Sequence, residues 1–242
     1  MDFCKKKSVP GVASPEEERW IWVGFAKESR LLLCIVVGPR IQDSADKLIE
    51  GIDSCLDKEN KLPLFVSDGN DQYKVALFNL YSETITPPRT GKLGRPKGPY
   101  RIPRMDLRYA QVVKEREGRK LVKVHKKIIF GNEEDISLSD ITTSHIERQN
   151  LTFRQENERL ARKTIGFSKE DYWLERQMVF YMSFFDFVRP HSGLKLKIEP
   201  DSDDITNRKY IRRTPMMAVG KTDHIWSLEE LLTFPYFKTS VN

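Results

Sequence analysis

The sequence contains no apolar run that is long enough to cross a lipid bilayer. Its longest apolar run, residues 31–37, has the length of one strand, whereas a membrane-spanning helix needs roughly 20 apolar residues. The first residues, Met-Asp-Phe-Cys-Lys-Lys-Lys, also lack the apolar stretch of a secretory signal peptide. We therefore expect neither a membrane protein nor a secreted protein, but a cytoplasmic one.

Cysteine is scarce, and its pattern argues against both a disulfide framework and a structural zinc site. The three cysteines, Cys4, Cys34 and Cys55, are odd in number and include no C-x-x-C pair. A disulfide framework needs paired cysteines, and structural zinc sites commonly take their ligands from such pairs. We expect three reduced thiols that serve mainly as packing residues.

The positive charge of the chain is concentrated in one segment. The net charge is +6 over 242 residues, yet residues 83–127 hold 14 basic and 4 acidic side chains, a net +10. The rest of the chain, with 27 basic and 31 acidic residues, has a net charge of −4. Many charged runs are simply solvated surfaces. This excess is larger than solubility requires and lies on Pro- and Gly-rich sequence, which favours a polyanionic partner.

The first third of the chain alternates between strand-like and helix-like patterns, which predicts an α/β fold. In chain order, the pattern predicts strands over 19–27 and 31–38, a helix over 42–56, a strand over 62–66 and a helix over 73–81.

The later part of the chain departs from this alternation. A Pro-rich stretch, 83–107, leads into a hairpin whose strands, 109–114 and 120–130, flank Glu117-Gly118. Helices are predicted over 144–163 and 168–188, each opening with a capping-box pattern, and a short helix over 227–233. We expect one domain over 1–188, with 83–130 as an insertion, and a C-terminal tail over 189–242.

Asp68 and Glu147 are the candidate functional carboxylates. Asp68 ends an apolar strand-like segment, where functional groups of open α/β sheets gather, but an aspartate before Gly69 is also an ordinary turn residue. Glu147 lies three residues after Ser144, as in a capping box. The helix that carries Glu147 is nevertheless polar on most sides, so it lies in solvent or faces a polar ligand.

Together these two carboxylates are suitable ligands for Mg²⁺ or Mn²⁺, which prefer hard oxygen donors. Two such ions can activate a hydroxyl nucleophile and stabilise the leaving oxygen in phosphodiester chemistry. Two carboxylates in a chain this rich in charge do not by themselves establish a metal site.

Several motifs resemble DDE transposases of the insertion-sequence-one type. The run Thr-Ser-His-Ile-Glu-Arg-Gln-Asn at 143–150, continuing to Lys169, resembles the glutamate block of that family. Ser67-Asp68-Gly69 resembles the second-aspartate block, residues 20–23 and 36–40 resemble the intervening strands, and residues 187–192 and 214–226 resemble the tail of one subgroup.

The resemblance implies an RNase H-like fold, a mixed sheet flanked by helices. It also implies that Asp68 and Glu147 are the second and third members of a triad that binds Mg²⁺ or Mn²⁺ for DNA strand cleavage and transfer. The implied partners are the ends of the insertion sequence, the target DNA and further copies of the chain. The implied location is the prokaryotic nucleoid.

The sequence departs from the family pattern at its front. Members carry an Asp-Glu-x-Trp-like motif on the first strand, upstream of a Phe and a run of Lys. Phe3 and the lysines after it match the end of that strand, so the motif would fall before Met1. Asp2 is the nearest substitute, but a shift of roughly four residues along a strand moves a carboxylate about 13 Å. We therefore expect a truncated or late-started transposase with little activity.

Basic residues around these motifs are candidate DNA contacts. Arg148 and Arg154 neighbour Glu147, and the hairpin places Lys114 near its expected tip. The Pro-rich stretch contributes Arg89, Lys92, Arg95 and Lys97. Gly94-Arg95-Pro96-Lys97 resembles an AT-hook, although an ordinary turn explains these four residues equally well.

Three functions therefore remain open. The first is a transposase catalytic domain that cleaves and joins DNA. The second is an inactive remnant that only binds DNA. The third is a nuclease that uses the same metal ions without joining strands.

Overall fold

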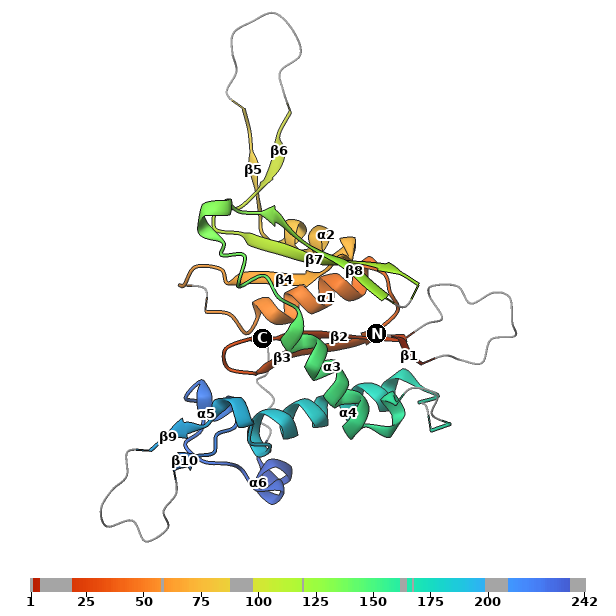
Figure 1. Cartoon of the computed structure of the whole chain (residues 1–242), viewed down its shortest axis with the longest axis vertical. Helices are drawn as coiled ribbons and strands as arrows, with labels where there is room; N and C mark the ends of the chain where they lie inside the picture. The colour runs from red at the N-terminus through yellow and green to blue at the C-terminus, as the bar shows by residue number, and fades with distance from the viewer. Residues whose placement is uncertain are drawn as a thin grey trace, which may run out of the picture. The chain divides into compact units, whose positions relative to one another are not determined.

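The structure is a computed structural model of the chain (Figure 1), and it describes residues 2–4, 19–57, 59–87, 98–118, 120–161, 165–166, 168–198 and 209–235. The chain forms two compact units. The first consists of Met1–Trp22 and Gly38–Phe167, and the second of Val23–Val37 and Ser168–Asn242. The expected domain boundary at residue 188 stays a prediction.

A small antiparallel sheet contains the first strands of the chain. Its order is β1-β2-β3, formed by β1 (Asp2–Cys4), β2 (Arg19–Phe25) and β3 (Leu32–Gly38). The turn between β2 and β3 is closed by the Ala26 N–H, which donates to the Leu31 carbonyl oxygen over 2.9 Å. The hairpin expected over 19–38 is therefore confirmed.

A second sheet in the first unit is mixed, which confirms the expected α/β class. In it, β4 (Leu64–Asp68) is parallel to β7 (Arg108–Glu117), and β7 is antiparallel to β8 (Lys120–Phe130). The strand order is β4-β7-β8. Ala110, Val112, Ile136 and Ile141 form a buried cluster at this sheet, with Leu64, Val66 and Ile128 packed against it.

Two helices flank β4 in the sequence and pack against each other. Helix α1 (Gln42–Asp53) buries Ala45, Leu48, Ile49 and Ile52, the apolar positions whose spacing predicts a helix. Helix α2 (Asp71–Leu80) begins after Asn70, whose side chain accepts a hydrogen bond from the Gln72 N–H. This cap stabilises the first turn of α2, directly after β4.

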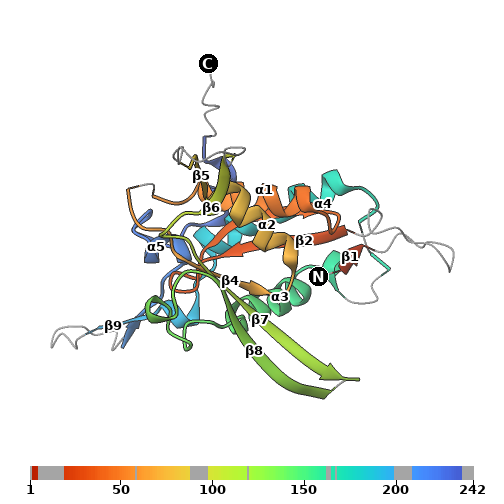
Figure 2. The same ribbon diagram turned by 90° about the horizontal axis from the view of Figure 1, so that it is seen from above.

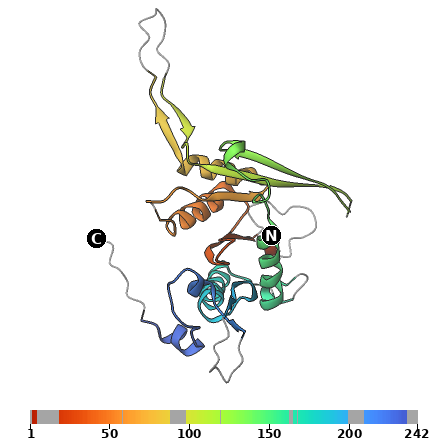
Figure 3. The same cartoon turned by 60° about the vertical axis from the view of Figure 1, so that its left-hand side comes forward.

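The Pro-rich stretch contains a hairpin arm that its composition did not predict. Strand β5 (Ser82–Ile85) pairs antiparallel with β6 (Tyr100–Pro103), and the two strands form an arm (Figure 3). In their register, Ile85 lies opposite Tyr100. Pro103 is tolerated because it ends a strand of this two-stranded sheet. The candidate DNA contacts Arg89, Lys92, Arg95 and Lys97 lie outside the described residues.

The strands β7 and β8 form a long two-stranded ribbon (Figure 2). Its turn includes Gly118, whose φ of 60° is a left-handed conformation that glycine adopts without strain. The expected hairpin around Glu117-Gly118 is confirmed. The ribbon carries a series of basic side chains: Lys114, Arg116, Lys120, Lys123, Lys126 and Lys127.

Helix α3 (Ser144–Glu156) ends seven residues before the predicted end at 163. Asn157 adopts an extended conformation, and its side-chain amide donates to the Phe153 carbonyl oxygen over 3.2 Å. The backbone N–H of Asn157 donates to the same carbonyl oxygen over 3.0 Å. Asn157 is thus the last residue with a helical hydrogen bond, and α3 ends where the backbone becomes extended. A 3-10 turn, Glu158–Leu160, follows.

The second unit is built on α4 (Asp171–Ser183), which passes into a π-helical turn, Phe184–Val188. The helix expected from residue 168 thus starts three residues later, and its predicted Ser168 cap is absent because Ser168 donates to the Glu170 carbonyl oxygen. Inside the π-helical turn, Asp186 is 2% exposed and accepts a hydrogen bond from the Leu32 N–H over 3.1 Å.

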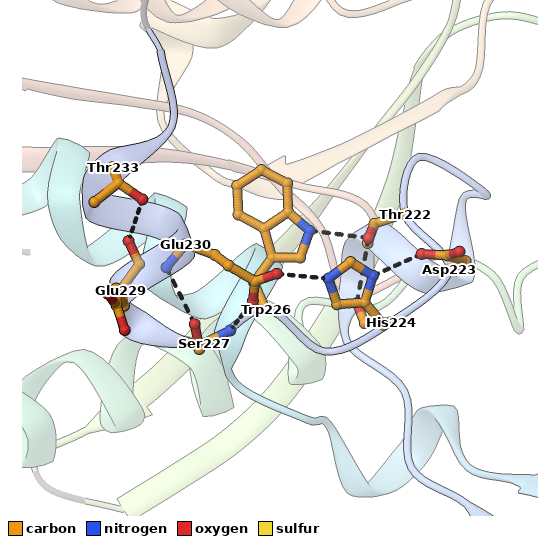
Figure 4. Close-up of polar contacts among 8 residues, drawn as sticks. All are labelled: Thr222, Asp223, His224, Trp226, Ser227, Glu229, Glu230 and Thr233. Atoms are coloured by element: carbon orange, nitrogen blue, oxygen red, sulfur yellow. Dashed lines mark hydrogen bonds and ion pairs between the residues drawn. The ribbon is translucent and has the colours of Figure 1, made fainter.

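The C-terminal part of this unit contains short elements: β9 (Leu196–Lys197), β10 (Tyr210–Ile211), α5 (Pro215–Ala218) and α6 (Leu228–Thr233). The predicted terminal helix is confirmed, and a capping box between Ser227 and Glu230 starts it (Figure 4). The His224 ring forms two hydrogen bonds, from Nδ1 to Oδ1 of Asp223 over 2.6 Å and from Nε2 to Oε1 of Glu230 over 3.1 Å. These hydrogen bonds raise the pKa of His224.

Within the described part of the chain, no helix combines the length and the apolar character needed to span a membrane.

Candidate metal centre

Asp68 is the last residue of β4, and its carboxylate is exposed. Its Oδ1 atom accepts a hydrogen bond from the Asn70 N–H over 3.2 Å, so Asp68 does shape the turn into α2. Gly69 lies close to Val113, since a Cβ atom at residue 69 would be 3.2 Å from Cγ2 of Val113. This close approach brings the turn after β4 against strand β7. Asp68 is therefore both a turn residue and a residue placed at the strand end.

Glu147 lies on the first turn of α3, but the predicted capping box is absent. Thr143, not Ser144, precedes the helix, and the Thr143 side chain makes no capping hydrogen bond. Oγ1 of Thr142 accepts a hydrogen bond from the Ser144 N–H over 3.3 Å. Instead, the Thr143 hydroxyl donates to Oε1 of Glu147 over 2.5 Å. The Lys114 ammonium group also donates to Oε1 and forms an ion pair with Glu147. The glutamate side chain thus reaches back to Thr143 at the start of the helix and across to Lys114 on β7.

One pocket brings Asp68 and Glu147 together. It has a volume of about 300 Å³ and is lined by Asp68, Gly69, Val112, Val113, Lys114, Thr143 and Glu147. The parallel register explains the arrangement, because Asp68 pairs with Val112 and Lys114 follows two residues later on β7. Residues from β4, β7 and the start of α3 therefore meet around one cavity, in which Asp68, Lys114, Thr143 and Glu147 are the polar lining residues.

The electrostatic environment keeps Glu147 ionised. Partial burial acts to raise the pKa of Glu147, but hydrogen bonds from Lys114 and Thr143, together with the positive charges of Lys114 and Arg116, lower it below its ordinary value. At neutral pH the pocket therefore presents a carboxylate from α3 rather than a carboxylic acid.

A buried hydrogen-bond network supports the strands that form the pocket. Tyr109 on β7 is fully buried, and its hydroxyl lies 2.7 Å from Oγ of Ser67 and 2.9 Å from Nε2 of Gln111. Burial is the main cause of the raised pKa of Tyr109, so the phenol stays neutral. A satisfied buried network of this kind fixes one arrangement of the two strands.

Sequence reasoning missed the roles of Lys114 and Thr143. Lys114 was expected near the hairpin tip, but it lies at the pocket and pairs with Glu147. The available signal was its place on the strand, two residues beyond Val112 on the same face. Thr143 was obscured by Ser144, which offers the same capping chemistry one residue later.

The other predicted site residues are not pocket-lining. Arg148 is exposed and Arg154 is half-buried, both on α3, and neither belongs to the set that lines the pocket. Asp2 lies on β1 with its backbone opposite Trp20. Its side chain is outside the described part of the structure, so its role as a substitute aspartate stays a prediction.

The pocket has the donor chemistry for Mg²⁺ or Mn²⁺. Mg²⁺ is usually held by one or two carboxylates while it keeps several waters or takes substrate phosphate oxygens. Asp68 and Glu147 meet that requirement. Among the described residues, no group of three or more His, Cys, Asp or Glu side chains is placed to hold a metal ion. Asp68 and Glu147, two of the residues to which the sequence resemblance assigns a metal-binding role, both line this pocket.

No curated protein and no solved structure gives a significant match to the chain. A family model described as IS1 transposase matches residues 124–187, a segment that holds most of β8, all of α3 with Glu147, and α4. The resemblance seen in the glutamate block is thus confirmed, because residues 124–187 match the family model of the IS1 transposase DDE domain.

Proposed function

We propose that this chain is the catalytic domain of an insertion-sequence transposase, in which Asp68 and Glu147 bind Mg²⁺ or Mn²⁺ for DNA strand cleavage and transfer. The observation that carries the proposal is the single pocket lined by both carboxylates, in a chain whose Glu147 segment matches IS1 transposases. The parallel pair β4–β7 within a mixed sheet and the adjacent α3 are consistent with an RNase H-like fold.

The residues of the pocket have separable tasks in this function. The bound metal ions would activate a hydroxyl nucleophile and stabilise the leaving oxygen. Asp68 and Glu147 supply the carboxylate oxygens, and the Thr143 hydroxyl holds Glu147 in one orientation. Preorganised ligands matter because in-line displacement depends on the positions of the reacting atoms.

DNA is the partner that the charge distribution supports. The basic side chains of the β7–β8 ribbon begin at the pocket with Lys114 and continue along both strands. A two-stranded ribbon fits the major groove of B-DNA, and lysine and arginine contacts to phosphates give most of the non-specific affinity. Arg89, Lys92, Arg95, Lys97, Arg148 and Arg154 remain proposed contacts. We propose the ends of the insertion sequence and the target DNA as ligands, and self-association on them.

A second candidate function is an inactive remnant that only binds DNA. The observation that favours it is the pair of carboxylates where the resemblance implies three, among the residues that the structure describes. If the third carboxylate ligand is absent, metal affinity falls and the ions lose the placement that displacement needs.

An assay of strand cleavage and joining tests the proposed function. Labelled duplexes made from the DNA that flanks the gene would be incubated with the chain and Mg²⁺ or Mn²⁺. We expect little or no joined product from the chain as written, and no cleavage at all from Asp68→Asn or Glu147→Gln.

The same assay has two outcomes that would contradict this account. Cleavage that is unchanged in Asp68→Asn would remove the pocket from the mechanism. Abundant joined product that persists in Asp2→Ala would show that strand transfer does not need Asp2 as a substitute for the first aspartate of the family pattern.

A further inference from the structure

Lys114 lines the pocket beside Glu147 and carries the positive charge that pairs with the Glu147 carboxylate. Its ammonium group donates to Oε1 of Glu147, and both residues line the pocket together with Asp68. The Lys114 side chain is 30% exposed and that of Glu147 is 51% exposed, so water reaches the pair. In this structure, therefore, a lysine provides the cation for a carboxylate that is proposed to bind metal.

We propose that Lys114 is an exchangeable counter-ion, which pairs with Glu147 in the metal-free protein and leaves it for a DNA phosphate when a divalent cation binds. This inference rests on the metal site proposed above. It assigns to Lys114 two successive partners within one pocket, first a protein carboxylate and then the DNA backbone.

The chemistry of lysine suits such an exchange. Lysine carries a compact charge on a flexible four-carbon stem, so its ammonium group can move while its backbone stays in the sheet. A partly exposed ion pair contributes little to stability, because water screens it and two side chains lose freedom to form it. The pair between Lys114 and Glu147 can therefore open without unfolding β7 or α3.

Coulomb repulsion gives the expected size of the effect. An ammonium group a few ångströms from a divalent cation opposes its binding, and in high-dielectric surroundings this repulsion corresponds to roughly a tenfold loss in affinity. A bound divalent cation also weakens the attraction between Lys114 and Glu147, because the metal then neutralises the carboxylate charge.

The alternative is that the ion pair only fixes α3 to β7. The two explanations differ in the effect of removing the ammonium group. A structural pair predicts that metal affinity falls or stays unchanged when the pair is lost, because Glu147 becomes less well held. An exchangeable counter-ion predicts that metal affinity rises.

A titration with Mn²⁺, followed by electron paramagnetic resonance of the free ion, separates the two. We expect Lys114→Met to bind Mn²⁺ about tenfold more tightly than the wild type. Lys114→Arg keeps the charge and should stay within about twofold of the wild type. Lys123→Met is a matched control, because it removes one positive charge from an exposed position on β8 outside the pocket.

The DNA half of the proposal has its own readout. The logarithm of DNA affinity falls with the logarithm of salt concentration by about 0.9 per phosphate contact. With Mn²⁺ present, the wild type should show a slope steeper by about 0.9 than that of Lys114→Met, and without metal the two slopes should agree.

Several outcomes would overturn the proposal. If Lys114→Met is folded by circular dichroism but binds Mn²⁺ no more tightly than the wild type, Lys114 does not compete with the metal. If the slopes agree with Mn²⁺ present, Lys114 does not pass to a phosphate. If the wild type, Lys114→Met and Lys114→Arg all fail to bind Mn²⁺, the metal site itself is absent and the proposed function fails with it.

Discussion

The Asp186→Asn variant is expected to lose most of a pH dependence of stability that the wild type shows between about pH 5 and 8. Asp186 lies in the π-helical turn with 2% of its surface exposed, and accepts one backbone hydrogen bond from Leu32. Burial outweighs that bond and raises the pKa of Asp186 to about 8. The folded protein therefore keeps a proton that the unfolded chain releases near pH 4.

The direction of the effect follows from this difference in bound protons. Where the folded state binds more protons than the unfolded state, the free energy of unfolding falls as pH rises, by up to about 1.4 kcal/mol per pH unit. The contribution of Asp186 is thus fully present below about pH 4 and is lost as pH rises through about 8. Asparagine cannot ionise, so it removes this slope.

Urea unfolding followed by tryptophan fluorescence, at steps from pH 5 to pH 9, measures the effect. The difference between variant and wild type cancels the contributions of other titrating groups, including His224. Between pH 5 and pH 8, we expect the free energy of unfolding of the variant to rise relative to that of the wild type by roughly 4 kcal/mol. A difference that stays constant with pH would show that Asp186 is ionised in the folded protein throughout.

The Phe153→Ala variant is expected to lose about 3 to 5 kcal/mol of stability, since it removes a fully buried aromatic side chain and leaves a cavity. Phe153 is 0% exposed, and Phe153 and Gln149 are the buried residues of α3. Phe153 is therefore the main apolar side chain that α3 buries, and its loss should loosen the helix that carries Glu147. We expect the variant to bind Mn²⁺ more weakly as well, because α3 is no longer fixed beside β7.

Leu151→Ala is the control for this prediction. Leu151 lies on the same helix but is 52% exposed, so its loss should change stability by about 0.5 kcal/mol or less. Chemical denaturation of both variants at one pH makes the comparison. Equal destabilisation by the two substitutions would mean that α3 is not anchored through Phe153.

Local sequence patterns predicted the elements that have strong periodicity. Helix α1 and the β7–β8 hairpin were found because apolar spacing in one and alternation around Glu117-Gly118 in the other agree with the final structure. The β5–β6 arm was missed because its strands flank a Pro-rich segment, and proline usually indicates a loop. The end of α3 was placed too late because the backbone becomes extended at Asn157, a position that no glycine or proline marks in the sequence.

The candidate site was only partly predictable for a different reason. Asp68 and Glu147 were selected from motifs, and the structure lines one pocket with both. The position of Lys114 depends on the parallel register of β4 and β7, which places Val112 opposite Asp68. Register between strands that are distant in sequence is set by tertiary packing, so hairpin geometry alone placed Lys114 wrongly.

Anomalous diffraction from crystals of the chain soaked in Mn²⁺ tests the shared carboxylate site most directly. The account predicts a manganese peak in the pocket, about 2.0 to 2.6 Å from carboxylate oxygens of Asp68 and Glu147, with the two carboxyl groups about 4 to 8 Å apart. A peak bound to neither residue, or carboxyl groups held more than about 12 Å apart, would contradict a metal site formed by these two residues.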